Sequence, residues 1–140
     1  MSIELTPEQQ EMVEIWDRHT SYEFETKDTE ETMRTMTDAP HVNHVPVMTG
    51  GFGRKNASDF YSKYFIPCQP QDVELAIVSR TVCSDTIVDE LIFKFTHSVD
   101  MPWMLPGIRP TGKKVMLPLV AIVGFKGGKI SSEHLYWDQA

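Results

Sequence analysis

The sequence predicts an α+β domain with three helices in its first half and an antiparallel sheet in its second half. In the first half, apolar residues recur at three- and four-residue steps, the spacing that gives a helix one apolar face. In the second half, runs rich in β-branched and aromatic residues are separated by polar or glycine turns. None of these short helices is stable alone, so they must pack on one face of the sheet.

Composition and charge narrow the class of protein. With 140 residues, 41% of them hydrophobic and 24% charged, the chain resembles one soluble globular domain spanning residues 1–140. Its formal net charge of −7 would repel the phosphates of nucleic acid. No apolar run reaches the roughly 20 residues of a membrane span, and the start lacks the pattern of a signal peptide. We therefore expect a cytoplasmic protein, with Cys68 and Cys83 as reduced thiols, that binds neither nucleic acid nor membrane.

The first helix is predicted to begin at residues 6–9, where Thr-Pro-Glu-Gln forms a capping box with proline at the first helical position. A second helix is predicted over residues 28–36. A third begins at residue 56 and ends at Pro67. The stripe on the first helix consists of Met12, Ile15, Trp16, His19 and Tyr22.

Four strands are predicted in the second half of the chain. The last two are joined by Gly127-Gly128, and glycines suit a tight hairpin turn because they tolerate positive φ. The strands are expected over residues 73–82, 87–97, 115–125 and 129–137. Helices first and a meander of strands afterwards place the helices on one face of a twisted sheet.

An earlier short strand is predicted over residues 42–48. Pro46 has no backbone N–H to donate, so this strand fits the edge of the sheet better than its centre. The glycine-rich residues 49–53 that follow are interpreted as a flexible turn into the third helix. They lack the Lys and the Ser/Thr of a phosphate-binding loop.

Three pairs of motifs extend along nearly the whole chain. They are residues 43–46 (Asn-His-Val-Pro) with 49–53 (Thr-Gly-Gly-Phe-Gly), 95–97 (Phe-Thr-His) with 107–113 (Gly-Ile-Arg-Pro-Thr-Gly-Lys), and 128–130 (Gly-Lys-Ile) with 133–138 (Glu-His-Leu-Tyr-Trp-Asp). In order and spacing these motifs resemble the SnoaL-like branch of the nuclear transport factor 2-like superfamily. That superfamily includes polyketide cyclases, ketosteroid isomerases and many members that only bind ligands or proteins.

The resemblance implies a cone-shaped, curved antiparallel or mixed sheet whose three N-terminal helices enclose an apolar pocket. It implies chemistry without a metal or an organic cofactor, carried out by carboxylates, histidines and tyrosines. Similar proteins often continue past the position of Ala140, so the resemblance also allows a C-terminus that is shortened here.

Strand parity selects candidate pocket residues, because positions two apart on a strand share one face. In the strand that ends at His97, we expect Phe93, Phe95 and His97 to face the pocket, with Glu90 and Lys94 outside. His97 is a candidate catalytic proton carrier, since imidazole titrates near neutral pH. The alternative is a histidine that is only hydrogen-bonded at a strand end.

In the last strand, His134, Tyr136 and Asp138 share one face, which we expect to line the pocket. The resemblance implies that Asp138 matches an aspartate that serves as acid/base in the cyclases, with His134 and Tyr136 as substrate-binding neighbours. In the alternative interpretation, Asp138 caps the strand end and faces water.

His44, Trp16 and Trp103 complete the predicted substrate-binding set. The resemblance places His44 near the pocket mouth, and Trp16 either lines the pocket from the first helix or belongs to the core. Trp103 lies in the apolar loop of residues 101–108, which we interpret as a lid over the mouth or a dimer contact. His41 and His44 lie three residues apart, but two histidines without a third ligand are a weak metal signal, so we expect no metal.

Two functions fit these predictions. The first is a cofactor-free acid/base enzyme of the cyclase, isomerase or dehydratase type, acting on a small apolar carbonyl-bearing or polycyclic substrate. His97 and Asp138 would shuttle its protons. The second is a non-catalytic module of the same fold that binds a small molecule or a protein. The resemblance also implies a homodimer through the open face of the sheet, where Glu90 and Lys94 would bridge protomers.

Overall fold

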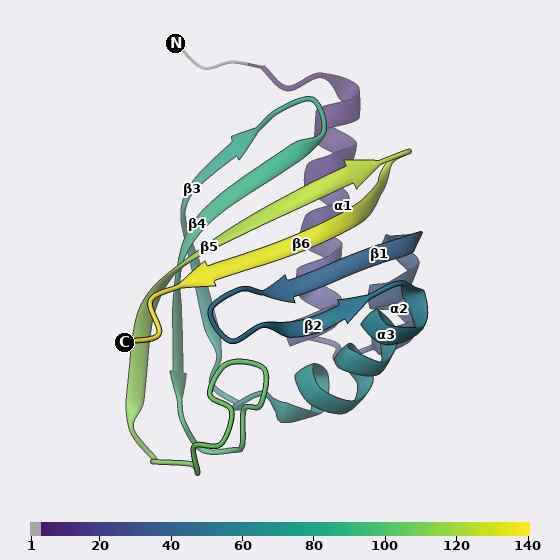
Figure 1. Ribbon diagram of the computed structural model, residues 1–140. Coiled ribbons are helices and arrows are strands. Elements are labelled where there is room, and N and C mark those ends of the chain that lie inside the picture. The colour runs from purple at the N-terminus through teal and green to yellow at the C-terminus, as the bar shows by residue number, and fades with distance from the viewer. Residues whose placement is uncertain (1–3) are drawn as a thin grey trace.

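The computed structural model describes residues 4–140 as helices packed on one six-stranded sheet (Figure 1). In chain order, the elements are α1 (Pro7–Phe24), α2 (Thr29–Arg34), β1 (Met36–His44), β2 (Thr49–Phe52), α3 (Arg54–Asp59), a π-helical turn (Phe60–Phe65), a 3-10 turn (Ile66–Cys68), β3 (Glu74–Val82), β4 (Thr86–Thr96), β5 (Lys114–Lys126) and β6 (Lys129–Trp137).

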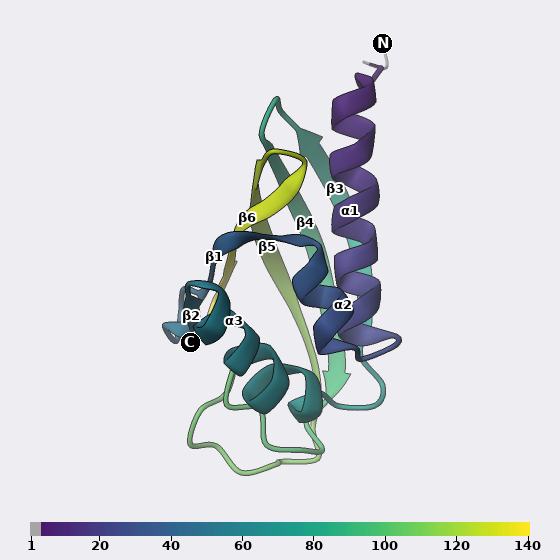
Figure 2. The same ribbon diagram turned by 90° about the vertical axis from the view of Figure 1, so that its right-hand side faces the viewer.

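The sheet has the strand order β2-β1-β6-β5-β4-β3. β1 runs parallel to β6, and all other neighbouring strands are antiparallel. Figure 2 shows α1, α2 and α3 together on one face of the curved sheet, while the other face has no helix on it. The predicted α+β class with a mixed curved sheet is therefore confirmed, whereas the helix count differs slightly from the three N-terminal helices expected, since a π-helical turn and a 3-10 turn continue α3, which follows β1 and β2. Among the residues described, no helix is both long and apolar enough to cross a membrane.

The first helix begins where the capping box predicts. The Thr6 side chain accepts a hydrogen bond from the Gln9 backbone N–H, and the Gln9 side chain accepts one from the Thr6 N–H. Its buried face consists of Met12, Trp16, His19 and Glu23. The predicted stripe included the first three of these residues but not Glu23, because a glutamate does not read as part of an apolar face.

The prediction of an edge strand over residues 42–48 is wrong in its position. β1 is an inner strand, paired with β2 on one side and β6 on the other, and Pro46 lies in the turn after it. The edge strand on this side of the sheet is β2, in the glycine-rich segment that was interpreted as a flexible turn. A Cβ at Gly50 would lie 1.9 Å from the backbone oxygen of Val42, so only glycine allows β2 to pair this closely with β1. The glycine-rich composition of this strand resembles that of a turn.

The hairpin between β5 and β6 follows the sequence prediction. Gly127 and Gly128 have φ angles of 59° and 76°, which suit a tight turn of this type. Parity in β4 is also as expected: Phe93 and Phe95 are buried, whereas Glu90 and Lys94 are exposed. The buried rows of β4, β5 and β6 face α1, and the core lies between them.

Phe93→Ala tests this packing. Phe93 is 1% exposed and its ring contacts those of Phe24, Phe95 and Trp103. Its truncation leaves a cavity and should lower the free energy of unfolding by about 3–5 kcal/mol in urea denaturation. Lys94→Ala, on the opposite face of the same strand, should change it by no more than about 0.5 kcal/mol. Similar losses for the two variants would contradict the assignment of the faces.

Candidate functional site

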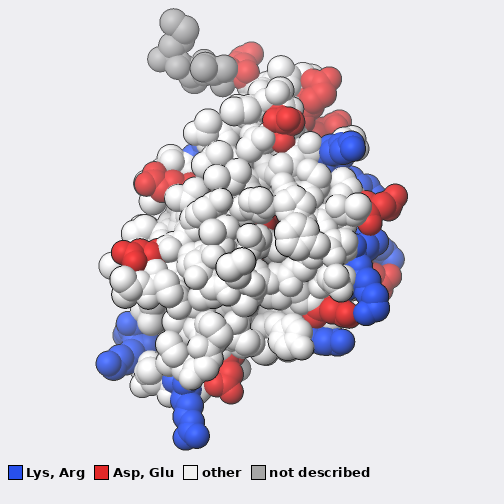
Figure 3. All heavy atoms as spheres, in the orientation of Figure 1, with Lys and Arg blue, Asp and Glu red and all other residues white. Residues whose placement is uncertain are grey.

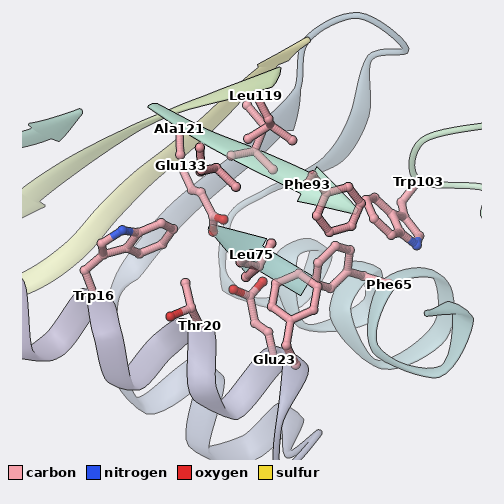
Figure 4. Close-up of a pocket in the computed structure, with 13 residues that line it drawn as sticks. Trp16, Thr20, Glu23, Phe65, Leu75, Phe93, Trp103, Leu119, Ala121 and Glu133 are labelled. Atoms are coloured by element: carbon pink, nitrogen blue, oxygen red, sulfur yellow. The ribbon is translucent and has the colours of Figure 1, made fainter. Parts of the chain in front are cut away.

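A small apolar pocket lies between α1 and the concave face of the sheet (Figure 4). Its volume is about 50 Å³, well below the roughly 150 Å³ of a cavity that holds benzene. Most of its wall is aliphatic or aromatic. The polar exceptions are Thr20, Glu23 and Glu133, and Figure 4 shows the two carboxyl groups directed toward each other across the space.

Four buried polar side chains meet at this wall: His19, Glu23, Tyr61 and Glu133. Glu133 Oε2 lies 3.1 Å from His19 Nε2 and accepts a 2.7 Å hydrogen bond from the Tyr61 hydroxyl. Glu23 Oε1 lies 3.3 Å from the same His19 nitrogen. His19 is completely buried, so the two carboxyl groups reach the pocket while the imidazole lies behind them.

Each of these side chains comes from an element whose geometry directs it inward. His19 and Glu23 are four residues apart on α1 and therefore share one helix face. Tyr61 lies in the π-helical turn, an irregularity that often occurs at functional sites. Glu133 lies on the inner face of β6, paired with Val42 of β1 and Val123 of β5.

The hydrogen-bond partners determine the protonation of His19. Its Nδ1 lies 2.7 Å from Thr35 Oγ1, and that hydroxyl donates its own proton to the Thr32 carbonyl. Thr35 therefore acts as an acceptor, and Nδ1 carries a proton. Nε2 faces carboxyl oxygens of Glu23 and Glu133. Because both ring nitrogens face acceptors, His19 fits the doubly protonated imidazolium form.

The surroundings shift the pKa values of the two carboxyl groups in opposite directions. Burial, and then the charge of Glu133, raise the pKa of Glu23 well above its ordinary value. Burial also acts to raise the pKa of Glu133, but the charge and hydrogen bond of His19 and the hydroxyl of Tyr61 outweigh it and hold that pKa below its usual value. Opposite shifts in a neighbouring pair assign an acid and a base. These directions favour a proton on Glu23 and an ionised Glu133.

A second network fixes one wall of the pocket. Trp16 Nε1 donates to Asp89 Oδ2 at 2.8 Å. Arg80 donates to both oxygens of Asp89, at 2.7 and 2.9 Å, and to Asp17 at 2.9 Å. The bidentate pair holds the indole of Trp16 against the pocket and links α1 to β3 and β4.

Several predicted pocket residues lie where the sequence analysis expected them. Trp16, Phe93 and Trp103 line the pocket. Phe95 is buried beside Phe93, with ring centroids 5.1 Å apart, but it lies outside the lining. His44 is also buried outside the lining, where its Nδ1 lies 3.1 Å from the Trp103 carbonyl oxygen and burial lowers its pKa.

The expected face of β6 was wrong. His134, Tyr136 and Asp138 do not line the pocket, because the buried row of this strand contains Glu133 and Leu135. Tyr136 is exposed, and His134 Nε2 lies 3.1 Å from His41 Nδ1, a residue of β1 outside the pocket. Asp138 lies beyond the strand, is exposed, and accepts a hydrogen bond from the Ala140 N–H. We expected the more polar row to face inward, whereas His19 and Tyr61 stabilise a buried carboxylate, Glu133, in the other row.

His97 is buried on the expected face but does not line the pocket. Its Nδ1 lies 3.2 Å from Thr111 Oγ1, and its backbone pairs with residues 112 and 113 of the following loop. This arrangement matches the alternative of a hydrogen-bonded strand end. In the apolar loop of residues 101–108, Met101, Trp103 and Met104 are buried, whereas residues 106–108 are exposed. Trp103 lies in the pocket wall, and its Nε1 donates to the Cys68 carbonyl.

The sequence did not identify four residues of the site, His19, Glu23, Tyr61 and Glu133. One signal was present: His19 lies on the apolar stripe of the first helix, and Glu23 follows it at the i+4 position. Tyr61 and Glu133 gave no comparable signal, because their roles depend on contacts across 72 residues.

His19, Glu23 and Glu133 also form the one group in the described part of the chain with the residue types for a metal ion. One ligand atom from each lies within 4.8 Å of the others. These atoms already contact one another as donors and acceptors, so the cluster is satisfied as a set of acid and base groups. The expectation of no metal stays a prediction.

Solved structures with the same architecture are numerous. A protein from Jannaschia sp. CCS1 assigned as a SnoaL-like polyketide cyclase has a TM-score of 0.72 at 18% identity, over 98% of this chain and 92% of its own. A protein of ketosteroid isomerase-like fold from Catenulispora acidiphila DSM 44928, in complex with trimethylamine, has a TM-score of 0.68 at 13% identity, over 96% and 88%. A protein from Burkholderia pseudomallei K96243, NTF2-like and of unknown function, has a TM-score of 0.70 at 12% identity, over 92% of each chain.

At these identities, the structural likeness shows the fold: the chain has the architecture of SnoaL-like and other NTF2-like proteins. No protein-family model matches the sequence, and no curated protein sequence matches it significantly. The three-dimensional comparison confirms the fold that the resemblance implied.

Glu23→Gln tests the assignment of the buried proton. A carboxyl group whose pKa is raised on folding gives its full stability below the unfolded value, near 4.5, and loses it as pH rises toward the folded value. The variant should match the parent near pH 4 and exceed its stability increasingly above that, by at most about 1.4 kcal/mol per pH unit. Urea unfolding between pH 4 and 8 measures this difference.

Glu11→Gln provides the control, because Glu11 is an exposed glutamate on the same helix. Its difference from the parent should not change over this pH range. If Glu23→Gln differs from the parent by the same amount at every pH, Glu23 is not the protonated group.

Proposed function

From the fold it shares with SnoaL-like and ketosteroid isomerase-like proteins, we propose that this protein is a cofactor-free acid/base enzyme of the isomerase or lyase type. Its substrate is a small, largely apolar molecule with a carbonyl group. The observation that carries the proposal is the pair Glu23 and Glu133, one protonated and one ionised, on the wall of an otherwise apolar pocket.

The hydrogen bonds of Glu133 leave it free to act as a base. Both His19 and Tyr61 contact Oε2, so Oε1 accepts no hydrogen bond from the described residues. In the proposed reaction, Oε1 removes a proton from the carbon next to the substrate carbonyl. Glu23 gives its proton to the carbonyl oxygen at the same time, so that an enol forms instead of an enolate.

The reverse transfers complete an isomerisation. For a substrate with a double bond between the β- and γ-carbons, the enol is a dienol, so Glu133 returns its proton to the γ-carbon and the enol hydroxyl returns the other proton to Glu23, which gives the α,β-unsaturated carbonyl compound. The charge of the site is the same before and after the reaction, so no counterion has to enter. The apolar wall keeps water away from the enol, and the Arg80–Asp89–Trp16 network holds that wall in place.

The size of the pocket favours the smaller members of the predicted substrate class. At about 50 Å³, the cavity accommodates a compact molecule, and a polycyclic substrate would require it to widen. Leu75 is the pocket residue nearest to solvent, 40% exposed on edge strand β3, so widening between β3 and α1 requires the least rearrangement.

A second candidate function is small-molecule binding without turnover. The structure from Catenulispora acidiphila is a complex with trimethylamine, so a protein with this fold holds a small molecule of this size class. The two candidates differ in one respect: the enzyme needs the proton of Glu23 to exchange, whereas a binding module does not.

Turnover by carboxamide variants separates these functions. A screen of small ketones and lactones for isomerisation or dehydration supplies the substrate. Glu23→Gln and Glu133→Gln keep the side-chain size but cannot exchange the proton, and each should lower kcat about 100-fold or more. Asp138→Asn changes an exposed carboxylate outside the pocket and should retain parental turnover. Parental turnover in both glutamine variants would rule out this acid/base pair.

We also propose a homodimer formed through the sheet face without helices. Figure 3 shows that charged side chains lie mainly at the rim of this face, and Val78 and Met116 on it are 59% and 69% exposed. Sedimentation equilibrium should show a dimer at micromolar concentration. Met116→Glu places a further charge on this face and should shift the species toward monomer, whereas Lys63→Glu, on the π-helical turn, should not. A parental monomer at this concentration would contradict the proposal.

A further inference from the structure

We propose that the pocket binds a small organic monocation of the alkylammonium class, which replaces the proton held by Glu23. This inference goes beyond the proposed reaction. It uses the same pocket but does not depend on turnover, because a bound cation leaves the proposed acid without its proton. Such a ligand is therefore an inhibitor if the protein is an enzyme, and the natural ligand if it is a binding module.

The shape of the pocket suits a compact, partly apolar cation. Its volume of about 50 Å³ is about a third of a benzene-sized cavity, so an ammonium group with about one methyl substituent fits directly, and a larger ion such as trimethylammonium requires the pocket to widen at the half-exposed Leu75. The wall includes the rings of Trp16, Phe24, Phe65, Phe93 and Trp103. Aromatic rings bind methylated ammonium groups both by apolar contact and through the negative potential of their faces.

The charges of the cluster leave one carboxyl group without a counterion. His19 as an imidazolium balances Glu133, to which it lies 3.1 Å away, and Tyr61 donates to the same oxygen. Glu23 is 2% exposed, and among the described residues its cationic neighbour is His19, which it shares with Glu133 at the shorter distance, so it stays neutral by keeping a proton. Nearby Arg80 cannot fill this role, because it is already paired with Asp17 and Asp89.

A monocation in the pocket supplies the missing counterion. With the cation bound, Glu23 ionises, and the buried site stays neutral because the ligand carries the charge that the proton carried. Binding therefore releases one proton. The titratable groups that face Glu23 are His19 on α1, Tyr61 in the π-helical turn and Glu133 on β6. Since those three keep their protonation in this exchange, the affinity should rise with pH while Glu23 is protonated in the free protein.

Titration calorimetry with trimethylammonium chloride tests the proposal. At pH 7, the cation should bind, and the measured heat should depend on the ionisation enthalpy of the buffer in the way that release of one proton requires. tert-Butanol is a neutral probe of similar size and should bind at least about 30-fold more weakly, since it cannot pair with a buried carboxylate. Equal affinity for the two probes, or a heat independent of the buffer, would overturn the proposal.

Variants locate the site. Glu23→Gln should weaken trimethylammonium binding at least about 30-fold and abolish the proton release, while thermal unfolding confirms that it is folded. Asp138→Asn removes an exposed carboxylate outside the pocket and should leave both unchanged. Unchanged binding in Glu23→Gln would overturn the assignment. The calorimetric outcomes are independent of any activity, so failure to find a substrate does not affect this test.

Discussion

The contact between His19 and Glu133 is the interaction on which the pocket depends. It joins the first helix to the last strand across 114 residues, and both side chains are almost completely buried. A buried charge is stable only when it is paired and hydrogen-bonded, so each of these residues requires the other. Tyr61 and Thr35 complete the hydrogen bonds of the pair. This arrangement places the ionised carboxylate of Glu133 at the wall of an apolar cavity. Without the contact to His19, a charge in these apolar surroundings would be strongly destabilising.

Glu23 adds a second carboxyl group, and with it an exchangeable proton, to the pair of His19 and Glu133. Ionising both carboxyl groups beside one imidazole is costly in a cavity this small and apolar, so the cluster holds one proton that has no fixed partner. The asymmetry follows from position. Glu133 accepts a hydrogen bond from the Tyr61 hydroxyl and lies 3.1 Å from His19 Nε2, whereas Glu23 lies 3.3 Å from the same nitrogen. The proposed proton transfer and the proposed cation binding both use the same property: Glu23 can give up its proton and become a buried negative charge.

The remainder of the fold shapes the space around this proton. Asp89 and Arg80 hold Trp16 at one end of the pocket, and the loop of residues 101–108 brings Trp103 to the other end. Both ends are fixed by hydrogen bonds, through Trp16 Nε1 to Asp89 and Trp103 Nε1 to the Cys68 carbonyl. Two tryptophans held in this way give the cavity defined limits, which accounts for its small volume. The edge strand β3, at Leu75, is the part of the wall with the least packing over it.

The sequence by itself determined the first helices, the four later strands and the α+β class, because capping residues, apolar spacing and β-branched runs act over a few neighbouring residues. It also determined which face of β4 is buried, since one row is aromatic and the other charged. It did not determine the face of β6, where the rows are alike in polarity, nor the pairing of β2, whose glycines resemble a turn. Only the tertiary structure decided that Glu133 points inward and Asp138 does not. The cost of burying a carboxylate is offset by His19 and Tyr61, and contacts between residues so far apart leave no local pattern in the chain.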